Sequence, residues 1–161
     1  MKVKKIVKAS LLKDKDYNLW VVLDQAWTAI FNGRGKELAQ YDITAMKAWL
    51  LFIVKTIGDE ATPAQIARVM HRRAHSVSGL LDRMDEDGLI TRAKDLDRKN
   101  LVRVTITDKG KKALKYTMKR ESIHSVMSVL SQREEEQLYS LMVKIRDRAL
   151  KEEGNQTLRY P

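Results

Sequence analysis

The chain has 161 residues, a length that fits one domain with helical extensions. Its net charge is +10, and the absence of cysteine excludes disulfides, thiolate metal sites and cysteine redox sensing. No stretch is long and apolar enough to span a membrane, so we expect a cytoplasmic protein without membrane partners.

The basic charge is concentrated in the middle of the chain. Residues 68–120 carry 15 Lys and Arg against 7 Asp and Glu, a net charge of +8. Residues 1–67 carry +3 and residues 121–161 carry −1. Such a segment indicates a polyanionic partner, and a solvated basic surface is the alternative interpretation.

The N-terminal part predicts an arm and a long helix. Residues 1–13 form a basic arm that could lie on a membrane, on DNA or on a partner subunit; packing on a subunit is the favoured interpretation, because its interspersed apolar side chains need covering. Residues 14–34 predict a helix, with Trp20 and Trp27 on one heptad-like apolar stripe. Two tryptophans on a stripe could line a ligand pocket, but a core or subunit interface is the favoured interpretation.

The next segment predicts a break and then a buried helix. Gly33 and Gly35 predict that the first helix ends or bends there. Residues 37–41 predict one separate helical turn. Thr44 can cap a mostly apolar helix that runs to about Thr56.

A helix-turn-helix pattern occupies residues 62–88. Thr62 is an N-cap, Pro63 suits the first helical position, and Gln65 completes a capping box. A polar turn over residues 71–73 separates this helix from a second one that Gly88 ends. The second helix has an apolar face formed by Val77, Leu80, Leu81 and Met84.

The remaining segments predict a β-hairpin and two further helices. Residues 89–92 and 101–106 read as strands joined by the charged loop 93–100, which is the pattern of a wing. Thr107 caps one helix, rich in lysine, that continues to about Leu130. A capping box of Ser131, Gln132, Arg133 and Glu134 starts a last helix, and residues 151–161 form a loose tail.

Several spaced motifs in this region resemble the multiple-antibiotic-resistance-regulator (MarR) family of winged helix-turn-helix repressors. The resemblance covers residues 41–115 and is carried by Leu80-Leu81-Asp82-Arg83-Met84, Gly88-Leu89-Ile90, Asp95-Leu96-Asp97-Arg98-Lys99 and Val104-Thr105-Ile106-Thr107-Asp108-Lys109-Gly110. That family often has Ser or Thr at the N-cap of its recognition helix, whereas here the position falls near Arg73 or Ala74.

The expected fold is mainly α with a small β wing. Residues 41–115 form the winged helix-turn-helix lobe; residues 1–40 and 116–161 supply the arm, the dimerisation helices and the tail. The terminal helices carry apolar stripes with no globular domain to cover them, and two subunits can cover them mutually. The resemblance implies the same homodimer.

The candidate DNA-contacting residues lie at the recognition helix and the wing. The start of the second helix of a helix-turn-helix meets base edges. The resemblance implies that an acidic wing residue steadies a basic side chain near that helix, here Asp97 with Arg83. It also implies that Arg98 enters the minor groove, while Lys94 and Lys99 contact phosphates. The remaining candidates are Arg72, Arg73, His75, Ser76, Ser78 and Gly79, the glycine having tight packing within the lobe as its alternative role.

The resemblance further implies that a small aromatic acid enters a cleft between the dimerisation helices and the winged lobe and releases DNA. The aromatic and thioether side chains on the expected helices are the candidates for this cleft, and for each a place in the core is the alternative. They are Tyr17, Trp20, Trp27, Met46 and Trp49.

Metal binding and catalysis are not expected. His71 and His75 are four residues apart, but the turn lies between them. No phosphate-binding loop, Gly-x-Ser-x-Gly motif or paired-carboxylate constellation is present, and we expect no cofactor.

The functional prediction is a homodimeric, sequence-specific transcriptional regulator acting as a repressor on an inverted-repeat operator. Its two recognition helices would enter successive major grooves ~34 Å apart. The alternative is an architectural or protein-interaction winged-helix module that has no sequence-specific operator.

Overall fold

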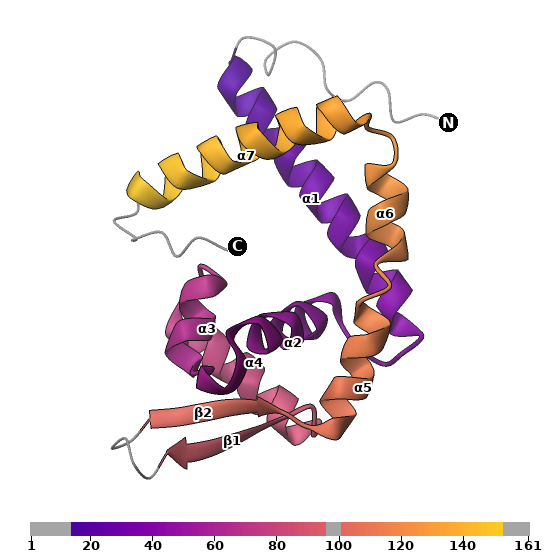
Figure 1. Cartoon of the computed structure of the whole chain (residues 1–161). Coiled ribbons are helices and arrows are strands. Elements are labelled where there is room, and N and C mark those ends of the chain that lie inside the picture. The colour runs from indigo at the N-terminus through magenta and orange to yellow at the C-terminus, as the bar shows by residue number, and fades with distance from the viewer. Residues whose placement is uncertain (1–13, 96–100, 153–161) are drawn as a thin grey trace.

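The computed structural model describes residues 14–95 and 101–152. Figure 1 shows a winged lobe, at the bottom, from which long helices extend upward. The elements in chain order are α1 (Lys15–Ala39), α2 (Ala45–Ile57), the 3₁₀ turn η2 (Gly58–Glu60), α3 (Pro63–Val69), α4 (Ala74–Glu86), β1 (Ile90–Asp95), β2 (Leu101–Ile106), α5 (Asp108–Thr117), α6 (Glu121–Met127) and α7 (Gln132–Glu152).

Helix α1 begins at Asp14, whose carboxylate accepts hydrogen bonds from the amides of the first turn. It continues through both Gly33 and Gly35 to Ala39. The predicted break at these glycines, and the separate turn at residues 37–41, were therefore wrong. A glycine inside a helix costs only about 1 kcal/mol relative to alanine, and the buried residues of this stretch anchor the helix to the rest of the protein.

The helices of the lobe begin and end at the residues that the sequence indicates. Thr44 caps α2, and the helix ends at Gly58, which has a φ of 77°. Thr62 and Gln65 form the reciprocal capping box of α3, with Pro63 in its first turn. These predictions are confirmed, because each depends on hydrogen bonds between residues three or four apart.

Helix α4 ends as predicted at Gly88, and the wing follows. Gly88 adopts a φ of 68°, and the Leu89 amide donates to the Met84 carbonyl over 2.9 Å. Strands β1 and β2 pair antiparallel, from Ile90 opposite Ile106 to Asp95 opposite Leu101. Strand β1 thus extends three residues beyond the predicted strand 89–92, into part of the expected loop.

The predicted single helix from Thr107 to about Leu130 is wrong. Thr107 caps α5 as expected, but α5 ends at Thr117 and α6 begins at Glu121. Between them, Arg120 takes a left-handed conformation with a φ of 55°. No glycine or proline marks this break, and the tertiary contacts at this point are described below.

The hydrophobic core lies in the lobe. Its fully buried large side chains come from the end of α1, from α2, α3 and α4, and from the sheet. They are Leu38, Leu50, Leu51, Ile53, Ile66, Val77, Leu81, Met84, Ile90 and Val104. The Val104 amide also donates to the Ala61 carbonyl over 2.9 Å, which ties the sheet to the segment before α3. The wing is therefore attached to the lobe by backbone hydrogen bonding as well as by packing.

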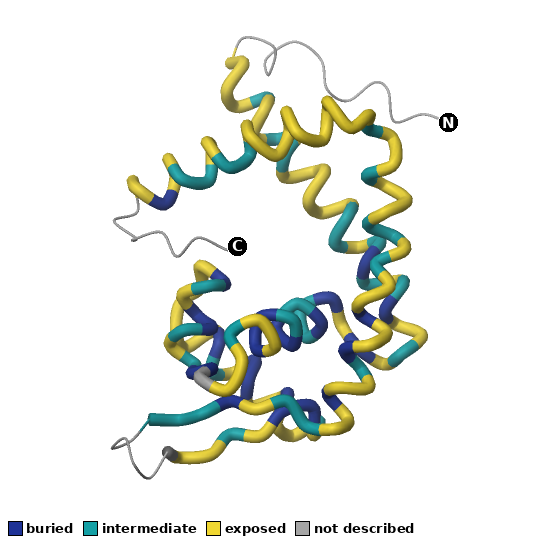
Figure 2. The backbone as a smooth tube through the Cα atoms, in the orientation of Figure 1, coloured by how far each residue is buried: buried dark blue, intermediate teal, exposed yellow. Residues whose placement is uncertain are grey.

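The long terminal helices carry apolar side chains on their surfaces. Figure 2 shows the upper part of α1 and most of α7 as exposed, and α7 has one buried residue, Leu150. The capping box that starts α7 is present, since the Ser131 amide and hydroxyl donate to the Glu134 carboxylate. The exposed apolar side chains of the two helices include Leu19, Trp20, Val22, Trp27, Leu138, Tyr139, Leu141 and Ile145.

The arm at residues 1–13 and the tail at residues 153–161 lie outside the described residues. The loose tail was predicted to begin at residue 151, but residues 151 and 152 belong to α7. No helix in residues 14–95 or 101–152 is long and apolar enough to cross a membrane.

Candidate nucleic-acid interface

Helices α3 and α4 form the predicted helix-turn-helix. The first ends at Met70, and the Arg72 amide donates back to the Ala67 carbonyl over 3.0 Å. His71 takes a left-handed conformation in the turn, with a φ of 48°. The buried side chains Ile66 and Val77 then hold the two helices to the common core.

The outer face of α4 and the turn before it are polar and basic. Arg72, Arg73, His75 and Ser76 are exposed, while Ser78 is half-buried. The structure thus brings these predicted residues together on one accessible surface, opposite the buried apolar face of the helix. Such a surface can present hydrogen-bond donors to base edges and cations to phosphates.

The N-terminus of α4 has no side-chain cap from its N-cap residue. Arg73 occupies the N-cap position, as the sequence indicates, and its side chain makes no capping hydrogen bond. The first turn also contains no acidic residue. Unsatisfied amides at a helix start favour phosphate oxygens, because the helix dipole is positive at that end.

Gly79 lies at an exposed position of α4 with open space around it. A Cβ atom built there would meet no heavy atom within 4 Å. Tight packing inside the lobe, the alternative role for this glycine, therefore does not apply within the described residues. An approaching ligand can come close to the backbone at this point.

An ion pair that the sequence did not indicate joins the recognition helix to the wing. Arg92 on β1 contacts the Asp82 carboxylate of α4. The predicted partner of Arg83, Asp97, lies outside the described residues, and Arg83 Nε instead donates to the Gly79 carbonyl over 3.1 Å. Alternation along β1 could have revealed Arg92, because residues two apart on a strand share a face with the buried Ile90.

The wing residues are only partly described. Lys94 is exposed on β1, opposite Val102 of β2. Arg98 and Lys99, predicted to contact the minor groove and a phosphate, lie outside the described residues. Their roles stay predictions.

The predicted ligand-binding residues fall into two groups. Tyr17, Trp20 and Trp27 are exposed on α1, and the Tyr17 and Trp20 ring centroids are 5.4 Å apart. Met46 and Trp49 are half-buried on α2 and pack against the core of the lobe. Their role in binding a ligand also stays a prediction.

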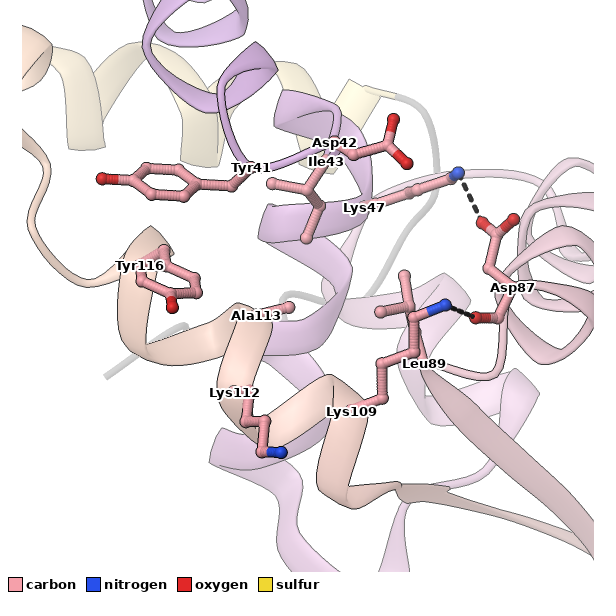
Figure 3. Close-up of a pocket in the computed structure, with 10 residues that line it drawn as sticks. All are labelled: Tyr41, Asp42, Ile43, Lys47, Asp87, Leu89, Lys109, Lys112, Ala113 and Tyr116. Carbon is pink, nitrogen blue, oxygen red and sulfur yellow. Dashed lines mark hydrogen bonds and ion pairs between the residues drawn. The ribbon is translucent and has the colours of Figure 1, made fainter.

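A pocket that none of these five residues lines opens between the start of α2, the end of α4 and α5 (Figure 3). The Tyr41 and Tyr116 rings stack at its edge with centroids 4.3 Å apart. Lys47 pairs with the Asp87 carboxylate at 2.5 Å, and Lys109 donates to the Asp87 carbonyl over 2.7 Å. Lys47 and Lys109 thereby join the starts of α2 and α5 to the end of α4.

The described residues contain no group of three or more His, Cys, Asp or Glu that could hold a metal ion. His71 lies in the turn and His75 in the first turn of α4, and both are exposed. The arrangement of the site is therefore one of donors, cations and an open helix start, which is suited to a polyanion.

Comparisons with known proteins agree with this geometry. A sequence profile of the MarR family matches residues 41–100. A search of curated proteins gave no significant match. The organohalide-sensing RdhR-CbdbA1625 transcriptional regulator in its 2,4-dichlorophenol-bound form is 26% identical, with a TM-score of 0.82, covering 93% of this chain and 90% of that one.

Two similar structures contain DNA. A cysteine-to-serine mutant of MarR from E. coli complexed with operator DNA is 18% identical, with a TM-score of 0.78, covering 85% of this chain and 99% of that chain. The S. aureus MepR–DNA complex is 22% identical, with a TM-score of 0.71, covering 87% of this chain and 99% of that chain. At these identities the two structures establish the shared fold.

Proposed function

We propose that the chain is a homodimeric MarR-family repressor that binds an inverted-repeat operator, because a MarR-family profile matches residues 41–100, which contain the helix-turn-helix and the first strand of the wing. It is a transcription factor rather than an enzyme, and it acts in the cytoplasm. The observation that carries the proposal is the exposed, donor-rich face of α4, with an uncapped N-terminus and no acidic residue in its first turn.

The charge of the lobe supports a DNA partner. The net charge of +8 over residues 68–120 covers the recognition helix, the wing and α5. Neutralising phosphates with Lys and Arg releases counterions, so affinity should fall steeply with salt. The two DNA-bound structures described above, those of MarR and MepR, are of proteins that share this fold.

The uncovered apolar surface supports a dimer. Trp20 and Trp27 on α1 are each 58% exposed, and Leu141 on α7 is 50% exposed. A second copy of the chain would remove this surface from water. Two-fold symmetry would then present two copies of α4 to half-sites ~34 Å apart, which calls for an inverted repeat.

A small aromatic effector is the proposed signal. The 26% identical regulator is named for organohalide sensing and holds 2,4-dichlorophenol. In this chain the cleft candidates are Tyr17, Trp20, Trp27, Met46 and Trp49. An aromatic ligand bound there should quench tryptophan fluorescence and weaken DNA binding, and a panel of phenols and aromatic acids that changes neither would refute the sensor role.

The operator proposal is tested by fluorescence anisotropy with duplex DNA from upstream of the chain's own gene and a scrambled duplex of equal length. A repressor should prefer the first by ~10³-fold or more. Ser76→Ala should reduce that preference, whereas Ser125→Ala, an exposed serine of α6, should leave it unchanged. Equal binding to both duplexes would favour the architectural module instead.

A further inference from the structure

Two charged residues of α1 lie at the point where the lobe joins the terminal helices. Arg34 and Glu37 are one helical turn apart, each with a side chain only 11% exposed, and their Nη1 and Oε1 atoms are 2.7 Å apart. Figure 1 shows this end of α1 beside the junction of α5 and α6. The pair therefore sits against the break that the sequence did not predict.

Arg34 binds the end of α5. Its Nη2 atom donates to the carbonyl of Thr117, the last residue of that helix, and Thr117 is itself buried. The last carbonyls of a helix lack partners within the helix and attract a cation. The guanidinium supplies both a donor and a positive charge at this point.

Glu37 binds the start of α6. Its carboxylate accepts from the amides of Glu121 and Ser122, each over 3.1 Å, and from the Ser122 hydroxyl. The N-cap residue Arg120 makes no side-chain cap of its own. Glu37 thus caps a helix that begins 84 residues later in the chain.

The carboxylate is held in its charged form. Burial raises the pKa of Glu37, but the Arg34 guanidinium and the hydrogen bonds from Ser122 outweigh it and lower the pKa to about 2. A second contact fixes the same junction, because the Arg120 guanidinium lies 5.0 Å from the centre of the Phe52 ring on α2.

We propose that Arg34 and Glu37 form a clasp that fixes the angle between the winged lobe and the terminal helices, and thereby the half-site spacing that the dimer accepts. The inference rests on the proposed function. Helix α5 packs on α2 and β2, whereas α6 packs on α1, so the turn between them is where the two parts meet. Residues 108–130 contain no proline and only Gly110 near the start, so without the clasp this stretch favours one continuous helix.

Binding to duplexes of varied spacing tests the clasp. Once the operator is mapped, its two half-sites are moved together or apart by one and two base pairs, and affinities are measured by anisotropy. Wild type should lose affinity about tenfold or more at the wrong spacings. Glu37→Gln should flatten this profile while keeping its preference for the half-site sequence over a scrambled one.

Glu121→Gln is the matched control. It removes a carboxylate from the same helix end, but the side chain is exposed and its amide still donates to Glu37. It should keep the wild-type spacing profile. A wild-type profile in Glu37→Gln, or an equal flattening in both variants, would overturn the clasp.

A measurement without DNA separates this inference from the proposed function. The chain has no cysteine, so Lys55→Cys, at an exposed position of α2, carries one spin label per protomer. The label-to-label distance distribution in the dimer should broaden in Glu37→Gln and not in Glu121→Gln; unchanged widths overturn the clasp. Wild type that binds operator and scramble equally refutes the repressor instead.

A milder variant covers the case in which Glu37→Gln does not fold. Ser122→Ala removes one donor to the carboxylate and leaves the ion pair in place. Circular dichroism shows whether Glu37→Gln folds, and Ser122→Ala is used if it does not. The same two outcomes, a flattened or a wild-type spacing profile, then support or overturn the proposal.

Discussion

Acidification should remove the clasp through the Glu37 carboxylate. The pKa of Glu37 is lowered from 4.5 to about 2 in the folded chain. A group with a depressed folded pKa stabilises the protein fully above its unfolded pKa, and this stabilisation is lost as the pH falls toward the folded value. The window is therefore about pH 4.5 down to about pH 2.

The magnitude follows from the same pair of values. At about 1.4 kcal/mol per pH unit, the depression from 4.5 to about 2 corresponds to about 3 kcal/mol of unfolding free energy. Roughly 2 kcal/mol of this is already lost at about pH 3. Solvent screening at this surface junction makes these values upper limits.

The assay is urea unfolding of wild type and Glu37→Gln at a fixed protein concentration, followed by circular dichroism from neutral pH to about pH 3. The variant lacks the titrating group, so the stability gap between the two proteins should narrow by roughly 2 kcal/mol on acidification. Glu121→Gln should run parallel to wild type. A gap of constant size across this range would refute the argument that Glu37 is held charged by its contacts.

Three further substitutions test other parts of the structure. Gly110→Ala should destabilise the lobe by about 3 kcal/mol in urea unfolding, because a Cβ there would collide with the Leu89 carbonyl. Gly33→Ala in α1 should instead stabilise the protein by about 0.5–1 kcal/mol, because a Cβ there meets nothing within 4 Å. Thr62→Ala should cost about 1 kcal/mol through loss of the α3 cap, and an unchanged melting temperature would contradict this. Arg92→Gln should lower the free energy of unfolding by under about 1 kcal/mol. It should also weaken DNA binding, because the Asp82 carboxylate loses its cation, and adding Asp82→Asn should restore the affinity measured by anisotropy.

Helix boundaries that depend on near neighbours could be predicted from the sequence. Thr44, Thr62 and Thr107 each cap the helix that was expected to follow them, because the acceptor and the amide are three residues apart. Gly88 ends α4 with a left-handed conformation for the same local reason. Periodicity then identified the buried and exposed faces of α4, and with them the polar surface that we propose for DNA binding.

The boundaries that failed depend on distant residues. The break between α5 and α6 is made by donors and acceptors on α1, 83 to 85 residues away in the chain, so no local signal marks it. Helix α1 also continues past Gly33 and Gly35, where its buried residues are Arg34 and Leu38. In the candidate site, the pairing of Arg92 with Asp82 across ten residues was missed because it needs the wing to fold back on α4.

The exposed surface of helix α7 makes repression depend on the concentration of the chain in the cell. Its 21 residues bury one side chain, Leu150, and isolated helices of this kind are marginal in water. If a second copy supplies the missing contacts, the helix and the dimer form together, and their population rises with the square of the chain concentration at low levels. Repression would then switch on over a narrow range of expression, so that a cell diluting the protein by growth would lose control of the promoter abruptly.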